Sequence, residues 1–224
     1  AAAAHAQQVT LTWATWGPEH VDRQLIEAFE KQHPNIRIEY IVTNHGEHHE
    51  RLKLLGAAGQ LPDIIAVDGM YLVEFVQNGL VRSIDDLIER DNLNINEYFP
   101  AALPDVEYRG ATYGLPYISA PYYLVYNVNH VEEAGLAYPP VDWDWDTYAD
   151  YAKKLTVSTD GERPLRWGSR LYTRWQVFWP WVWSAGGRVF DLENKRFTLT
   201  EAPAVAAFDW LTEMQRAEIA GPGN

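Results

Sequence analysis

The chain contains no cysteine, which excludes disulfide scaffolds and cysteine redox chemistry. It has no apolar run near the roughly 18 residues that a membrane-spanning helix needs. Basic residues are scarce, because 18 Lys and Arg stand against 31 Asp and Glu, for a formal net charge of −13. So acidic a chain offers no basic surface for nucleic acid or for anionic lipid. The absences therefore exclude nucleic-acid partners, a membrane span and disulfide chemistry.

Aromatic side chains are abundant instead, with ten Trp and thirteen Tyr among 224 residues. Hydrophobic residues make up 47% of the chain, enough to bury a sizeable core. Indole and phenol rings each carry a polar atom that needs a partner when buried. We therefore expect several of these rings to line a cleft.

In the first 80 residues, segments with the two-residue hydrophobic period of strands alternate with segments that have the 3.6-residue period of helices. The expected strands are Val9–Trp13, Ile36–Val42 and Asp63–Val67, and the expected helices are His20–His33, Gly46–Ala58 and Met70–Gln77. In the first helix, Val21, Leu25, Ala28 and Phe29 fall on one face. The apolar run at 63–67 is typical of a parallel strand covered on both faces. This order predicts a parallel, layered α/β lobe.

A ligand of such a sheet lies beyond the carboxyl ends of the strands. Here those ends are the loops Trp16–Glu19, Thr43–Glu47 and Asp68-Gly69. Topology therefore nominates side chains of these loops as ligand-binding candidates. They are Trp16, Glu19, His45 and Asp68.

A second α/β pattern follows two extended segments, Tyr113–Tyr117 and Tyr122–Asn127. We expect a first lobe over 8–117, a second over 118–224, and hinge strands near 113–127. In the second lobe a helix capped by Asp144 runs to Leu155. A strand over Arg166–Leu171, a helix over Arg174–Ala185 and a helix over Glu201–Ala217 complete the prediction.

Two clusters resemble metal sites without matching one. Asp142, Asp144 and Asp146 begin like a calcium loop, but Thr147 and Lys153 stand where it requires Gly and Glu. In the cluster His45, His48, His49 and Glu50, Lys53 replaces the second zinc-protease histidine. We interpret the aspartates as capping and solvated acids. The histidines have two interpretations, a weak metal site or a solvated loop leading into a helix, and the second is favoured. We predict no metal and no cofactor.

The strongest local signal is the aromatic segment around residues 172–183. Trp175, Trp179 and Trp183 share one helical face at i, i+4 and i+8. They fit either core packing or a platform for the apolar faces of sugar rings, with polar neighbours such as Arg174 for hydroxyl groups. The ligand-binding candidates here are Tyr172, Arg174, Trp175 and Trp179, with Gly186 and Gly187 as a turn that can approach a ligand closely.

Several short motifs occur in a fixed order along the chain. They are Leu11-Thr-Trp-Ala-Thr-Trp-Gly17, Phe29-Glu-Lys-Gln-His-Pro-Asn-Ile36, Leu61-Pro-Asp-Ile-Ile65, Phe75-Val-Gln-Asn-Gly-Leu80, Tyr113-Gly-Leu-Pro116, Leu124-Val-Tyr-Asn127, Glu133-Ala-Gly-Leu136, Pro139 through Thr147, Ser184-Ala-Gly-Gly187 and Phe190-Asp191. In this ordered set the chain resembles the extracellular solute-binding proteins of sugar ABC importers, the group that includes maltose- and glycerol-phosphate-binding proteins.

The resemblance implies a periplasmic-binding-protein-like fold of two α/β lobes, with parallel-rich sheets flanked by helices and the ligand between the lobes. It places Tyr117 at the crossover and supports Trp16, Glu19, Asp68, the Tyr172–Trp179 segment and Gly186-Gly187 as ligand-contacting positions. Arg174 stands near a position where maltose binders have an acid, which argues against a maltose-like ligand. An extracytoplasmic location and an importer permease as partner are also implied.

The family's members are considerably longer. The resemblance therefore implies that the second lobe is incomplete, and that the chain is a fragment or that a second chain supplies the C-terminal part. We expect that these 224 residues alone do not close tightly on a ligand.

Alternatives to a transport protein are a glycoside hydrolase and a sugar-sensing module without transport. A hydrolase needs two carboxylates across the scissile bond, and no motif marks such a pair. There is also no nucleophile elbow and no phosphate-binding glycine loop, so no catalytic residue is predicted. The ligand stays open between an oligosaccharide, a monosaccharide and a sugar or polyol phosphate, for which Arg170 and Arg174 are the candidate partners.

Overall fold

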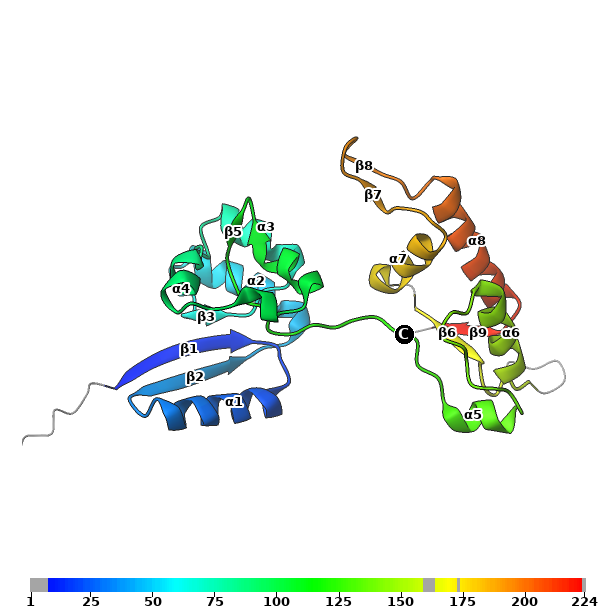
Figure 1. The fold of residues 1–224 in the computed structure, drawn as a ribbon, viewed down its shortest axis with the longest axis horizontal. Helices are drawn as coiled ribbons and strands as arrows, with labels where there is room; N and C mark the ends of the chain where they lie inside the picture. Colours follow the sequence, from blue (N-terminus) through cyan, green and yellow to red (C-terminus); the bar gives the residue numbers. More distant parts are fainter. Residues whose placement is uncertain (1–7, 159–163, 173, 223–224) are drawn as a thin grey trace, which may run out of the picture. The chain divides into compact units, whose positions relative to one another are not determined.

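A computed structural model describes residues 8–158, 164–172 and 174–222. The chain divides into two compact units, Ala1–Ala120 and Pro121–Asn224. Figure 1 shows that both units combine helices with strands. In the described part of the chain no helix is long and apolar enough to cross a membrane. Each unit is described by itself below.

The first unit is built on a three-stranded parallel sheet in the order β2-β1-β3. Its strands are β1 (Val9–Thr15), β2 (Ile36–Val42) and β3 (Ile64–Ile65), and its connecting helices are α1 (Glu19–Gln32), α2 (His45–Ala57) and α3 (Gly69–Gln77). Seven residue pairs join β1 to β2, from Val9–Ile36 to Thr15–Val42. The predicted parallel β-α-β-α-β-α order is confirmed (Figure 1).

The core of the first unit lies between this sheet and helices α2 and α3. Ala14, Leu52 and Phe75 are almost fully buried there. The apolar face of α1 is different, since Leu25 is 52% exposed and Val21 and Phe29 also face solvent. The one fully buried side chain of α1 is charged, namely that of Asp22. The periodicity of α1 is therefore right for a helix but does not identify the face that it buries.

Two further details differ from the expectation for this unit. The apolar run at 63–67 forms only the two-residue strand β3, and Ile64 is 48% exposed, so the run is not covered on both faces. Residues 113–127 contain no strand, since only the Tyr113 N–H, which donates to the Val106 carbonyl at 2.9 Å, bonds this extended chain to a neighbouring backbone segment among the described residues. Short elements fill the interval before it. They are α4 (Asp85–Arg90), η1 (Ile95–Glu97), η2 (Pro100–Val106), β4 (Glu107–Tyr108) and β5 (Ala111–Thr112).

The second unit contains four helices and two strand pairs among its described residues. Its helices are α5 (Val128–Glu133), α6 (Trp145–Leu155), α7 (Trp175–Ser184) and α8 (Ala202–Arg216). Strand β6 (Ser169–Leu171) runs parallel to β9 (Ala220–Pro222). The predicted cap of α6 is confirmed, because the Asp144 carboxylate accepts from the Thr147 N–H at 2.8 Å.

Aromatic and small side chains fill the core of this unit. One cluster is Tyr148, Ala152, Leu171, Met214 and Ala220, and the other is Val182, Val189, Ala204 and Ala207. Between them Trp181 contacts Trp145 and Trp210, with ring centroids 6.0 and 4.9 Å away. Helices α6, α7 and α8 are thereby held together through indole rings.

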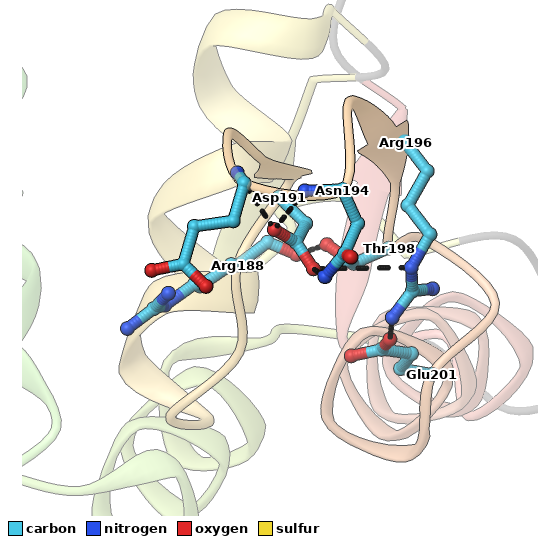
Figure 2. Close-up of polar contacts among 7 residues, drawn as sticks. Arg188, Asp191, Asn194, Arg196, Thr198 and Glu201 are labelled. Atoms are coloured by element: carbon cyan, nitrogen blue, oxygen red, sulfur yellow. Dashed lines mark hydrogen bonds and ion pairs between the residues drawn. The ribbon is translucent and has the colours of Figure 1, made fainter.

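An antiparallel hairpin of β7 (Phe190–Asp191) and β8 (Arg196–Phe197) precedes α8. Figure 2 shows how polar groups fix its turn. The Asp191 carboxylate accepts from the backbone and the side-chain amide of Asn194, at 3.0 and 2.8 Å. Arg196 then reaches Glu201 at 2.6 Å and ties the hairpin to the start of α8. These contacts also hold the pKa of the Asp191 carboxyl below its usual range, chiefly through Asn194.

Candidate functional site

The carboxyl ends of β1, β2 and β3 bring three predicted site residues together in the first unit. Trp16 follows β1, His45 opens α2 after β2, and Asp68 precedes α3. The ring of Trp16 lies 5.2 Å from that of His45, centroid to centroid, and His45 Nε2 lies 3.0 Å from Asp68 Oδ2. A carboxylate only accepts, so His45 donates this hydrogen bond. An indole ring and an acceptor carboxylate thus lie side by side.

Beneath this group, His48 is fully buried and joins two strand ends. Its Nε2 donates to the Ala66 carbonyl at 2.8 Å, since a carbonyl can only accept. Its Nδ1 is then an acceptor for the Thr43 hydroxyl. This neutral form suits the site, because burial lowers the pKa of His48.

His49 supports Asp68 from the same helix. Its side chain is 4% exposed, its ring stacks on Tyr71 at 4.0 Å, and its Nε2 accepts from the Asp68 backbone N–H at 3.0 Å. Burial lowers the pKa of His49 to about 4. The ring of Trp16 also contacts His48 and His49, at 4.9 and 5.3 Å. The histidines of α2 therefore hold the loops in place.

The favoured interpretation of these histidines as a solvated loop was wrong for His48 and His49. A signal was available, since 45, 48 and 49 share one helical face at i, i+3 and i+4. What the sequence could not show is that this face packs against the strand ends. In the described part of the chain, no group of three or more His, Cys, Asp or Glu is arranged to hold a metal ion.

Two predicted residues of the first unit lie apart from Trp16, His45 and Asp68. Glu19, in the first turn of α1, pairs with Arg23 at 2.6 Å. Tyr117 directs its hydroxyl at Asp22 and packs its ring against Trp13, with centroids 5.6 Å apart. Within the described parts of the chain, neither forms a hydrogen bond, an ion pair or a ring pair with those three residues.

In the second unit, α7 presents different rings on its two faces. Trp181 is partly buried and packs against both core clusters, whereas Trp175 is 43% exposed and Trp183 also faces solvent. Trp179 is half-buried between them, with centroids 4.4 Å from Trp175 and 6.4 Å from Trp183. We call Trp175, Trp179 and Trp183 the tryptophan ridge. Core packing thus describes Trp181 and one side of Trp179, which also packs against the Val182 cluster, and the ridge leaves ring surface accessible mainly at Trp175 and Trp183.

The other predicted residues of this unit lie at the two ends of α7. Tyr172 and Arg174 are exposed at its start, where Arg174 is the N-cap residue. Gly186 and Gly187 follow its last turn, about 15 Å away at the usual helical rise. Gly186 has φ +78°, and a Cβ on Gly187 would lie 2.9 Å from Val182 Cγ1. Gly186 therefore adopts a left-handed backbone conformation that favours glycine, and Gly187 has no room for a side chain.

The chain matches known proteins along nearly its whole length. Residues 17–223 match the family model described as bacterial extracellular solute-binding protein. A putative binding protein of Brucella abortus is 29% identical over 200 residues, which cover 87% of this chain and 47% of that protein.

Solved structures show the same fold at low identity. An ABC substrate-binding protein of Listeria monocytogenes, solved in complex with cycloalternan, is 21% identical with a TM-score of 0.81, covering 96% of this chain and 55% of that one. UgpB of Mycobacterium tuberculosis, in complex with glycerophosphocholine, is 20% identical with a TM-score of 0.80 and the same coverage. These matches confirm the predicted two-lobed, periplasmic-binding-protein-like α/β fold. The chain spans about half the length of these proteins.

Proposed function

The chain belongs to the family of bacterial extracellular solute-binding proteins, and on this premise we propose that it captures a carbohydrate ligand as the binding component of an ABC importer. The observation that carries this proposal is the tryptophan ridge, whose first ring, Trp175, is 43% exposed beside Arg174. Exposed indole faces match the apolar faces of sugar rings. In the first unit, Trp16 beside His45 and Asp68 offers the same combination of ring and polar groups.

Both units carry polar groups beside their rings. Asp68 provides acceptor oxygens for hydroxyl groups, and Arg174 provides a planar set of donors. A ligand that contacts both units favours the state in which both contacts are made, so it shifts the chain toward a closed form. An importer permease would recognise that closed form outside the cytoplasm. No covalent step is required, and the protein is proposed to be no enzyme.

Different ligand classes would use different side chains of the second unit. An oligosaccharide takes ring surface from Trp175 and Trp179, whereas a polyol phosphate requires charge-assisted bonds from Arg170 or Arg174. The ring centroids of Trp175 and Trp179 lie 4.4 Å apart with the ring planes tilted by 47°, so two indole rings adjoin on this helix. This favours a carbohydrate with more than one apolar face over a small phosphate ester.

Isothermal titration calorimetry tests the proposal, because it measures affinity without an indole reporter and so applies to the Trp175 variant as well. The chain is titrated with maltotriose, glucose and glycerol 3-phosphate. We expect a saturable heat change with an oligosaccharide. Trp175→Ala should weaken the affinity for that oligosaccharide about tenfold, the equivalent of about 1.4 kcal/mol of lost ring contact. Phe197→Ala, which removes a 67% exposed ring from the hairpin, is the matched control and should leave affinity unchanged.

Two results would contradict the proposal. One is an equal loss of affinity in Trp175→Ala and Phe197→Ala. The other is release of the chromophore from aryl-glycosides by the purified chain, which would favour a glycoside hydrolase. If only glycerol 3-phosphate binds, and Arg174→Gln abolishes that binding, the ligand class changes while the binding role stands.

A further inference from the structure

Asp22 is a buried carboxylate that the proposed binding role does not use. It lies in the first turn of α1 and is 0% exposed. Its Oδ2 accepts from the Tyr40 hydroxyl at 2.6 Å, and its Oδ1 accepts from the Tyr117 hydroxyl. No Lys or Arg forms an ion pair with it in the described part of the chain. A buried polar group is costly without hydrogen-bond partners, and here the two tyrosine hydroxyls are those partners.

The surrounding backbone leaves room for this arrangement. A Cβ on Gly17 would lie 2.7 Å from the Tyr117 hydroxyl and 2.8 Å from Asp22 Oδ2. Any larger residue at 17 would therefore displace one of them. Burial, followed by the hydrogen bond to Asp22, raises the pKa of both Tyr40 and Tyr117, which keeps their hydroxyls protonated as donors.

The two hydroxyls come from different kinds of segment. Tyr40 belongs to β2, an edge strand of the sheet. Tyr117 lies on the extended chain that leads out of the first unit, which ends at Ala120. Asp22 thus connects the first helix of the unit to its last residues.

Beyond Tyr117 the chain loses such contacts. Residues 118–125, all of them described, have no hydrogen bond, ion pair or ring contact. Contacts resume in the second unit, where Tyr126 lies 6.1 Å from Tyr138 between ring centroids and Asn127 caps α5. The stretch without polar or ring contacts therefore starts after Tyr117, with Ile118 and Ser119 lining a pocket beside Tyr98 and Phe99, and ends at Tyr126.

We propose that Asp22 is a positioning residue, which fastens the crossover chain to the first unit through Tyr117 and so confines motion between the units to residues 118–125. A hinge works through a few residues that absorb the change in backbone angles. Fastening Tyr117 to Asp22 shortens the part of the crossover chain that can move freely. A shorter flexible connection raises the effective concentration of one unit near the other. The role in ligand capture rests on the proposed function, but the anchor itself does not.

Spin-label mobility tests the anchor without any ligand. Because the chain has no cysteine, a single Ser119→Cys substitution places one nitroxide two residues beyond Tyr117. Tyr117→Phe removes only the hydroxyl that reaches Asp22. Tyr40→Phe is the matched control, because it removes the other hydroxyl donated to the same carboxylate.

We expect the label at 119 to become more mobile in Tyr117→Phe, with a rotational correlation time about twofold shorter, and in Asp22→Asn as well. Tyr40→Phe should leave the label unchanged. Circular dichroism checks that each variant is folded. If Asp22→Asn does not fold, the comparison of Tyr117→Phe with wild type decides the outcome. Equal mobility in wild type and Tyr117→Phe, or the same rise in Tyr40→Phe, would overturn the proposal. Failure of sugar binding would not affect this readout, so the two proposals fail separately.

Discussion

Lowering the pH from 7 to 5 is expected to destabilise the first unit, because His49 is folded in its neutral form. Its Nε2 accepts a hydrogen bond from the Asp68 N–H at 3.0 Å, and a protonated imidazole cannot accept. The ring is also stacked on Tyr71 and is only 4% exposed. Protonation therefore requires His49 either to leave its site or to remain charged without full hydration.

The pKa of His49 sets the size and the pH window of this effect. Burial lowers it from 6.5 to about 4, and His48, His45 and Lys53 act in the same direction while Asp68 opposes them. The unfolded chain then takes up a proton first, so stability is complete above pH 6.5 and declines as the pH falls toward 4. The full effect is about 3 kcal/mol, of which about 2 kcal/mol is lost by pH 5. His48, whose pKa burial also lowers, adds to the decline.

Urea denaturation at pH 7, 6 and 5 measures this loss, and hydrogen exchange of α2 peptides assigns it to the first unit. His49→Gln keeps an acceptor for the Asp68 N–H but cannot titrate in this range, so its stability should fall less steeply with acid. His20→Gln alters an exposed histidine of α1 and should keep the wild-type slope. A wild-type chain equally stable at pH 7 and 5, or a His49→Gln slope as steep as that of wild type, would refute the reasoning.

Two further predictions, one on packing and one on helix capping, concern the second unit, and thermal and urea denaturation measure both. Gly168→Ala should cost about 3 kcal/mol or more, because its Cβ would lie 1.7 Å from the Ala152 carbonyl oxygen. Gly46→Ala, whose Cβ would meet only a side-chain oxygen at 3.4 Å, is the control and should change stability far less. Asp144→Ala should cost about 1 kcal/mol by removing the cap of α6. Asp146→Ala in the same turn should cost less, and equal losses would show that capping is not the cause.

Local sequence signals predicted the regular elements well, for reasons that are local themselves. The cap at Asp144 needs only a side-chain oxygen three residues before the Thr147 N–H. The alternation of Ile36–Val42 and the spacing of Trp175 and Trp179 likewise reflect geometry within one element. These features were therefore predictable from neighbouring residues.

The candidate site was predictable only in part. That Trp16, His45 and Asp68 would meet followed from parallel strands, whose carboxyl ends share one edge. That His48 and His49 would be buried beneath them did not follow, because burial depends on segments distant in the sequence. The same limit applies to Tyr117, whose hydroxyl partner is 95 residues away.

The amino-acid sequence alone determined the α/β class, the order of elements and the family to which the chain is similar, because these depend on periodicity and on ordered motifs. Tertiary structure alone decided which face each helix buries. It turned α1 so that Asp22 is buried while Leu25 faces solvent, and it divided the rings of α7 between a core, with Trp181, and an exposed ridge. The physical reason is that burial is a property of what packs against a side chain.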